Sequence, residues 1–214
     1  GFVGVLFLIP LIVDLTGPAG LSRASGVGLF ADTGPFWRIN YQRGEHSSVT
    51  TVSALLFHNK PVNYGLAFLE NYADHFWGWF LFLSGDVIQR NKVPEMGQMY
   101  LLDLVFLVAG FFAIARNSSG WGPILMWLLV APLGAALTFQ SPHALRAQNM
   151  VVPLVIISAF GSISLVEWLK TVIRWRPLLF TIYYLLFTIY VWDFTRYLHQ
   201  YYVHMEKTYD FSSQ

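Results

Sequence analysis

Long runs of apolar residues dominate the second half of the chain. They cover about residues 99–115, 121–139, 149–169 and 177–197, and each run is apolar on every side rather than along one face. A helix that is apolar all round suits contact with lipid, and about 20 residues are needed to cross the hydrocarbon layer. The pattern therefore predicts four transmembrane helices within residues 99–197.

A shorter apolar stretch occupies residues 1–13. It has no basic start of the kind that signal peptides carry, and it begins with Gly1 rather than Met. We interpret it as the end of a fifth transmembrane helix whose beginning is missing. The sequence would then be the C-terminal part of a longer protein.

Residues 14–98 separate this stretch from the four long runs, which is too far for a plain connector. Within this region, residues 63–84 carry aromatic and other large side chains at helical spacing, namely Tyr64, Phe68, Tyr72, His75, Phe76, Trp79 and Phe82. Glu70, Asp74 and His75 lie in the middle of the same stretch, where ionised groups are costly inside a bilayer. We therefore predict a helix on the membrane surface or against the bundle, not a further span.

The two short links between the long runs set the expected topology. Residues 116–120 and 170–176 hold four basic residues and no acidic one: Arg116, Lys170, Arg174 and Arg176. Short basic links stay in the cytoplasm. The loop region 14–98, the link 140–148 and the tail 198–214 are then non-cytoplasmic. The expected fold is an all-α integral membrane protein with about five spans and one long outward loop.

Composition agrees with this interpretation and removes several functions. The 214 residues are 55% hydrophobic and only 12% charged, whereas soluble domains are about 25% charged. The net charge of +1 leaves no nucleic-acid footprint, and the absence of cysteine excludes disulfides and thiol nucleophiles. No phosphate-binding glycine loop, nucleophile elbow or zinc-protease motif occurs, and His199 and His204 in the tail are read as surface residues without a metal-ligand pattern.

The stretch Ser141-Pro142-His143-Ala144-Leu145-Arg146 is the strongest candidate for chemistry. Ser is a preferred N-cap and Pro a preferred first helical residue, so a helix is predicted to start here. His143 and Arg146 would then share one face at the outward end of a span. Free amides, Arg and His together suit a phosphate at the membrane surface. The simpler alternative is a snorkelling Arg and a capping His.

Two further clusters are candidates for substrate contacts. Asp86, Arg90, Asn91 and Lys92 lie where the aromatic helix joins the first long run, and a solvated turn is the alternative there. The other cluster is His58-Asn59-Lys60, which suits an anionic or sugar ligand but equally an exposed turn. Near one span end, Asp103 is expected to form a structural ion pair with Arg90 or Arg146.

Several short segments, spread over roughly residues 22–161, follow one another in a definite order. They are Ser22-Arg23-Ala24-Ser25-Gly26-Val27, His58-Asn59-Lys60, Asn71-Tyr72-Ala73-Asp74-His75-Phe76, Phe80-Leu81-Phe82, Gly85-Asp86, Arg90, Gly97-Gln98-Met99-Tyr100, and Ala131-Pro132 through Thr138 to Pro142-His143-Ala144-Leu145-Arg146. Their order resembles the C-terminal half of family 39 membrane glycosyltransferases, which have the GT-C fold and are related to the protein mannosyltransferases that use dolichyl-phosphate-mannose. Bacterial members carry a similar series, so the resemblance implies a bacterial plasma membrane as the location. These members often have His at the position of Asn91, and this departure argues against a role for Asn91 in proton transfer.

The resemblance implies an inverting enzyme that takes a sugar, mannose as the first expectation, from a polyprenyl-phosphate carrier. The acceptor would be a protein or glycan at the non-cytoplasmic face, and no metal or tightly bound cofactor is expected. The family's catalytic acids lie in an outward loop upstream of this sequence. The implied role of this region is to hold the carrier phosphate, first through His143 and Arg146 and then through Arg90.

Two other functions stay open at this point. A transporter or flippase could use the same basic rim and aromatic residues for a lipid-linked or anionic solute. Transporters usually carry charges deep in their spans or paired broken helices, whereas the ionisable residues here lie near helix ends. A non-catalytic membrane scaffold is the third possibility.

Overall fold

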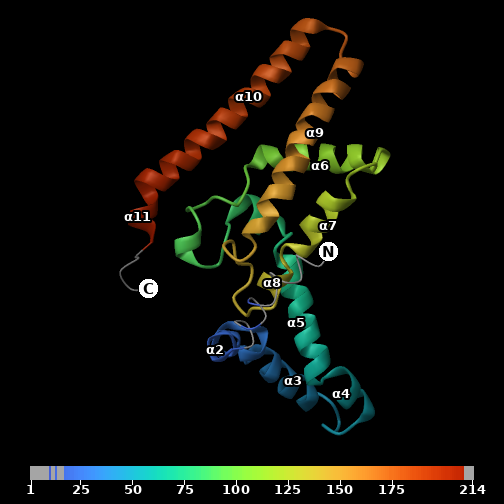
Figure 1. Cartoon of the computed structure of the whole chain (residues 1–214), viewed down its shortest axis with the longest axis vertical. Coiled ribbons are helices and arrows are strands. Elements are labelled where there is room, and N and C mark those ends of the chain that lie inside the picture. The colour runs from blue at the N-terminus through green and yellow to red at the C-terminus, as the bar shows by residue number, and fades with distance from the viewer. Residues whose placement is uncertain (1–9, 11–12, 14–16, 210–214) are drawn as a thin grey trace. The chain divides into compact units, whose positions relative to one another are not determined.

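The computed structural model describes residues 10, 13 and 17–209, which form helices joined by turns, with no strand in these parts of the chain (Figure 1). The chain divides into two compact units. The first contains the residues up to Asn71 together with Ala136–Gln140, and the second contains Tyr72–Ala135 and the residues from Ser141 onward. The prediction of an all-α chain is confirmed for the described residues, and the truncated span predicted at 1–13 lies almost entirely outside them.

The first unit is more helical than the sequence pattern indicated. Its helices are α2 (Pro18–Val27), α3 (Gly34–Gly44), α4 (Val52–Phe57) and most of α5 (Lys60–Asp74). The short segment 136–140 is tied to this unit by backbone and side-chain hydrogen bonds. The Leu29 amide donates to the Leu137 carbonyl over 2.8 Å, and the Asn71 side-chain amide donates to the Thr138 carbonyl over 2.9 Å.

The aromatic helix predicted at 63–84 is interrupted, so its predicted length is wrong. Helix α5 ends at Asp74, and a separate π-helical turn covers Trp79–Leu83. The amides of His75 and Phe76 each bond to the carbonyl three residues earlier, which tightens and closes the last helical turn. The resulting bend accompanies complete burial of the His75 side chain.

The second unit contains the apolar helices α6 (Leu101–Arg116), α7 (Gly122–Val130), α8 (Leu133–Ala136, whose last residue belongs to the first unit), α9 (Val151–Val172) and α10 (Arg176–His199). Among the described residues, two helical stretches are long and apolar enough to cross a membrane: Gln148–Val172, with 25 residues, and Arg176–Thr208, with 33. The predicted spans at 99–115 and 121–139 form helices too, but shorter ones. Pro132, which lacks an amide donor, separates α7 from α8.

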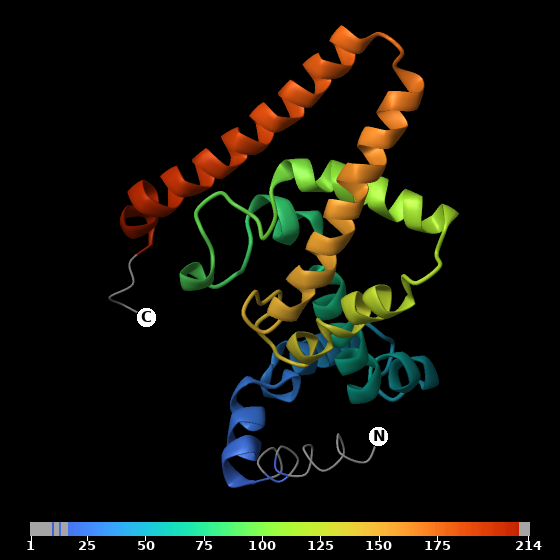
Figure 2. The ribbon, with the colours of Figure 1, turned by 45° about the horizontal axis from the view of Figure 1, so that its top comes forward.

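Helices α6 and α9 pack backbone against backbone where they cross (Figure 2). A Cβ added to Gly161 would overlap the Phe106 carbonyl and lie 2.6 Å from the Gly110 amide, and one added to Gly110 would overlap the Ile157 carbonyl. The two glycines therefore permit this crossing. Gly134 differs from both, since a Cβ added there would have no atom within 4 Å.

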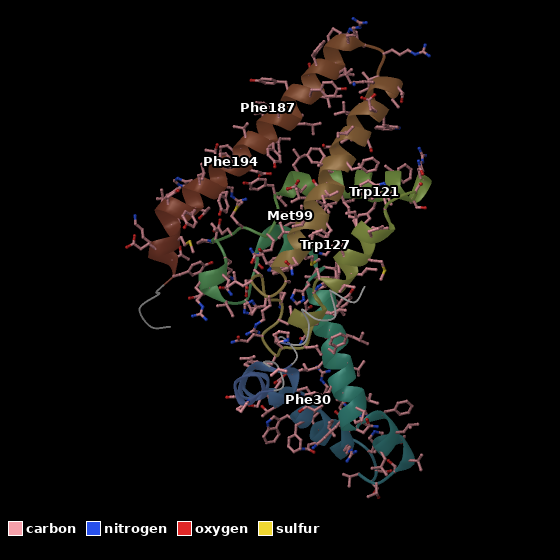
Figure 3. All side chains as sticks on the ribbon, in the orientation of Figure 1. Phe30, Met99, Trp121, Trp127, Phe187 and Phe194 are labelled. Atoms are coloured by element: carbon pink, nitrogen blue, oxygen red, sulfur yellow. The ribbon has the colours of Figure 1, made fainter. Side chains whose placement is uncertain are left out.

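Helix α10 is exposed along most of its length. Phe187 and Phe194 project from it (Figure 3), with 68% and 48% of their surface exposed. Asp193 is the buried residue of this helix, next to the contacts that Tyr100 makes with Tyr190 and Tyr197. Such a large apolar surface on one helix requires lipid or another protein surface to cover it.

Candidate functional site

The buried carboxylate of Asp86 organises the candidate site. Asp86 is only 1% exposed. It follows Gly85, whose positive φ of 68° suits glycine. The Oδ2 atom accepts hydrogen bonds from the Ala144 amide at 2.7 Å and from the Asn91 side-chain amide at 3.1 Å. The Oδ1 atom accepts one from the Ile88 amide at 2.8 Å. A buried carboxylate needs hydrogen-bond donors to replace the water it has lost, and here neutral amides supply them.

His75 holds the same loop from another segment. Its side chain is fully buried, and its Nε2 accepts a hydrogen bond from the His143 amide at 3.2 Å. The acceptor role requires that this Nε2 carries no proton, so the His75 ring is neutral with its proton on Nδ1. Two successive amides, those of His143 and Ala144, are thus held by side chains far upstream in the sequence.

These anchors explain why the helix predicted to start at Ser141-Pro142 is absent. Residues 141–147 form a turn-rich loop after a cis Ser141-Pro142 bond, a 3₁₀ turn follows at Gln148–Met150, and α9 begins only at Val151. The prediction of a helix start at Ser141 is therefore wrong, and neither the 3₁₀ turn nor α9 has a side-chain N-cap. The loop instead takes its shape from hydrogen bonds to His75 and Asp86, which the local sequence does not indicate.

The loop also contains two buried nitrogen atoms that have no hydrogen-bond partner among the described residues: Nη1 of Arg146 and Nδ1 of His143. The His143 Nδ1 lies 3.6 Å from Asp86 Oδ2, which is too long for a hydrogen bond. Burial lowers the pKa of His143, and the nearby Arg146 cation lowers it further, against the opposing effect of Asp86. The site therefore keeps His143 neutral and leaves one side of the Arg146 guanidinium without a protein acceptor.

Arg90 and Asn91 lie together in a 3₁₀ turn at Gln89–Asn91. Asn91 points to Asp86 and so positions the carboxylate. Arg90 is exposed, yet it is close enough to contribute to the lowered pKa of His143. Five of the residues predicted from sequence are therefore brought together: Asp86, Arg90, Asn91, His143 and Arg146. His75 joins them, although the sequence pattern marked it only as an ionisable residue within an aromatic helix.

Two of the three residues of the other predicted cluster, Asn59 and His58, form hydrogen bonds within the first unit. Asn59 caps α5 by accepting a hydrogen bond from the Val62 amide at 2.9 Å. The His58 carbonyl accepts one from Arg43 Nε at 2.7 Å. Lys60 borders an apolar cavity of about 480 Å³ whose other lining residues are Leu29, Phe30, Pro61, Tyr64, Gly65, Phe68 and Leu137. The sequence left an exposed turn as the alternative to a ligand site, and the structure shows a turn in which Asn59 caps α5.

Asp103 does not form the ion pair expected with Arg90 or Arg146. Its Oδ1 accepts a hydrogen bond from the Ser158 hydroxyl at 2.7 Å, which joins α6 to α9, and its Oδ2 accepts one from the Tyr100 amide at 3.1 Å. A hydroxyl group and a backbone amide are thus the partners of the Asp103 carboxylate, in place of the expected arginine.

Comparisons with protein-family models, with curated proteins and with solved structures find no match for this chain. Within the described part of the chain, no group of three or more His, Asp or Glu side chains is placed to hold a metal ion. The chemistry of the site therefore has to be argued from its own geometry. A half-buried guanidinium with an unpartnered nitrogen, beside a neutral buried imidazole and a second Arg, suits an anion.

Proposed function

We propose that this chain is part of a membrane glycosyltransferase that takes a sugar from a polyprenyl-phosphate carrier. Loop 141–147 and Arg90 bind the carrier phosphate in this proposal. The observation that carries it is the buried Arg146 Nη1, which has no acceptor among the described residues. A guanidinium donates in a planar fork that fits two phosphate oxygens, so a phosphate would fill the missing acceptor position.

The arrangement of Asp86 supports this role because the carboxylate does not neutralise Arg146. The contacts described for its two oxygens are with the Ile88 amide, the Ala144 amide and the Asn91 side chain. Asp86 thus shapes the loop while the guanidinium stays available. When a glycosyl group leaves its carrier, negative charge grows on the phosphate, and a prepositioned cation stabilises that charge.

The position of the loop in the chain suits a lipid-borne substrate. Loop 141–147 leads directly into Gln148–Val172, one of the two stretches in the described part of the chain that are long and apolar enough to cross a membrane. A phosphate attached to a lipid would meet the protein at such a helix end. The full five-span arrangement and the outward orientation of this loop belong to the proposal, as do mannose as the sugar and a protein or glycan as the acceptor.

The test is sugar transfer from a polyprenyl-phosphate donor by the full-length protein in lipid nanodiscs. Arg146→Ala is expected to lower kcat by about 10²–10³, the range seen when one donor to a developing oxyanion is removed. Arg146→Lys keeps the charge but loses the fork, so it should retain part of the activity. Arg174→Ala, in the link between α9 and α10, is the matched control.

Unchanged turnover in Arg146→Ala would remove the assigned phosphate contact. Movement of the lipid across the bilayer without any glycosyl transfer would show that the protein acts as a flippase and not as a glycosyltransferase.

A further inference from the structure

Two histidines at the end of α10 lie in direct contact. The Nε2 atoms of His199 and His204 are 3.1 Å apart, and the ring centroids are 4.8 Å apart. His199 is exposed and His204 is half-buried, so a solute can reach the pair from solvent. The pair lies in the segment from α10 to α11 (Met205–Thr208), which takes no part in the Asp86 site.

A π-helical turn brings these residues together. In an α-helix, side chains five residues apart point about 140° away from each other, because each residue turns the helix by about 100°. Gln200–His204 instead forms a π-helical turn, in which a backbone amide bonds to the carbonyl five residues earlier. This geometry places both imidazoles on one face. A search of the sequence for the usual i, i+4 histidine spacing misses the pair.

We propose that His199 and His204 chelate a divalent transition-metal ion such as Cu²⁺ or Zn²⁺. Two nitrogen ligands at metal distances of about 2.0–2.1 Å and angles of about 90–109° lie about 2.8–3.4 Å apart, and the observed Nε2 separation is within this range. Both Nε2 atoms must be free of protons to bind metal, so the donor ring of the pair moves its proton to Nδ1. Neutral imidazole is a preferred ligand of both ions.

The surroundings define the kind of site. A cavity of about 430 Å³ adjoins His204 and is lined also by Pro94, Glu95, Gln200, Thr208 and Tyr209. Glu95 is already engaged by Arg196 at 3.5 Å, so we do not count its carboxylate as a ligand. Two protein ligands leave the other coordination positions to water or a small anion. The site is therefore an exchangeable one, unlike a structural zinc site with four protein ligands.

The experiment uses the full-length protein, purified without a polyhistidine tag and kept in detergent. Zn²⁺ is titrated by calorimetry, and Cu²⁺ is added for electron paramagnetic resonance. One site per chain is expected, with two imidazole nitrogens in the Cu²⁺ spectrum. His199→Ala and His204→Ala should each weaken binding about tenfold or more, because even loss of an outer-shell partner has an effect of that size.

The chain offers a matched control pair. His46 and His58 are also in ring contact, with centroids 5.1 Å apart, but they lie in the first unit and on different segments. His46→Ala should leave the affinity unchanged. Binding that persists in His199→Ala and His204→Ala, binding lost in His46→Ala, or a Cu²⁺ spectrum with fewer than two imidazole nitrogens would each overturn the proposal. Circular dichroism of each variant checks separately that the helices remain folded.

Discussion

The substitution Asp86→Asn tests whether the carboxylate shapes loop 141–147. It keeps the size of the side chain but replaces one oxygen with an NH₂ group. In the native protein one oxygen faces two donors, the Ala144 amide and the Asn91 side chain, and the other faces the Ile88 amide. Whichever way the new amide is turned, its NH₂ group meets at least one donor. At least one buried N–H group therefore loses its acceptor.

The expected effect follows from these contacts. Loss of one hydrogen bond to a buried charged group, with its partner left unsatisfied, lowers the free energy of unfolding by about 2–3 kcal/mol. For a chain of this size, that corresponds to a fall in Tm of about 4–12 °C. Asn91→Ala removes one donor and leaves the other contacts of Asp86 in place. Asn91→Ala should lower the free energy of unfolding by only about 1 kcal/mol.

Thermal unfolding in detergent, followed by tryptophan fluorescence, measures this difference. Hydrogen exchange of the peptide containing Ala144 reports on the loop itself and should accelerate in Asp86→Asn. The matched control is Glu206→Gln on the exposed surface of α11. If Asp86→Asn unfolds within about 1 °C of the native protein and its Ala144 amide exchanges no faster, the carboxylate does not anchor the loop.

Three other outcomes are expected. Gly161→Ala should lower Tm by several degrees, because the added Cβ would separate α6 from α9. Gly134→Ala is the control and should leave Tm unchanged, because the space around its added Cβ is open. Equal Tm values for the two variants would contradict the packing of α6 against α9. Because the pKa of folded His143 lies below its usual 6.5, the unfolded chain binds more protons, so stability should fall as pH drops below about 6.5 toward the folded pKa. A melting series in which His143→Gln keeps the same pH dependence would refute this. A reporter fused after Arg174 should read cytoplasmic, and an external signal would reject the proposed orientation.

The sequence predicted the long apolar helices well because their signal is local. Runs of apolar residues located α9 and α10 to within a few residues. It was less accurate where distant contacts decide the structure. The predicted helix at 63–84 is interrupted after Asp74, and the sequence did not indicate that Gly110 and Gly161 bring α6 and α9 together.

The candidate site shows the same division. Residue types and their order along the chain indicated His143, Arg146, Arg90, Asp86 and Asn91. The sequence did not indicate that Asp86 would bind the Ala144 amide, or that His75 would bind the His143 amide. A buried histidine within an aromatic stretch has the same local pattern as one that faces solvent. Its role becomes visible only when the partner loop is in place.

The distances along the chain between loop 141–147 and its two anchors bear on how the site assembles. The bond from His143 to His75 joins residues 68 positions apart, and the bond from Ala144 to Asp86 joins residues 58 positions apart. Contacts of such long range form after local helices, because the intervening chain must first be closed into a loop. We therefore expect the loop to acquire its shape late, after α6 and α7 have formed. A fragment starting at Met99 would carry every residue of the loop and still lack what folds it.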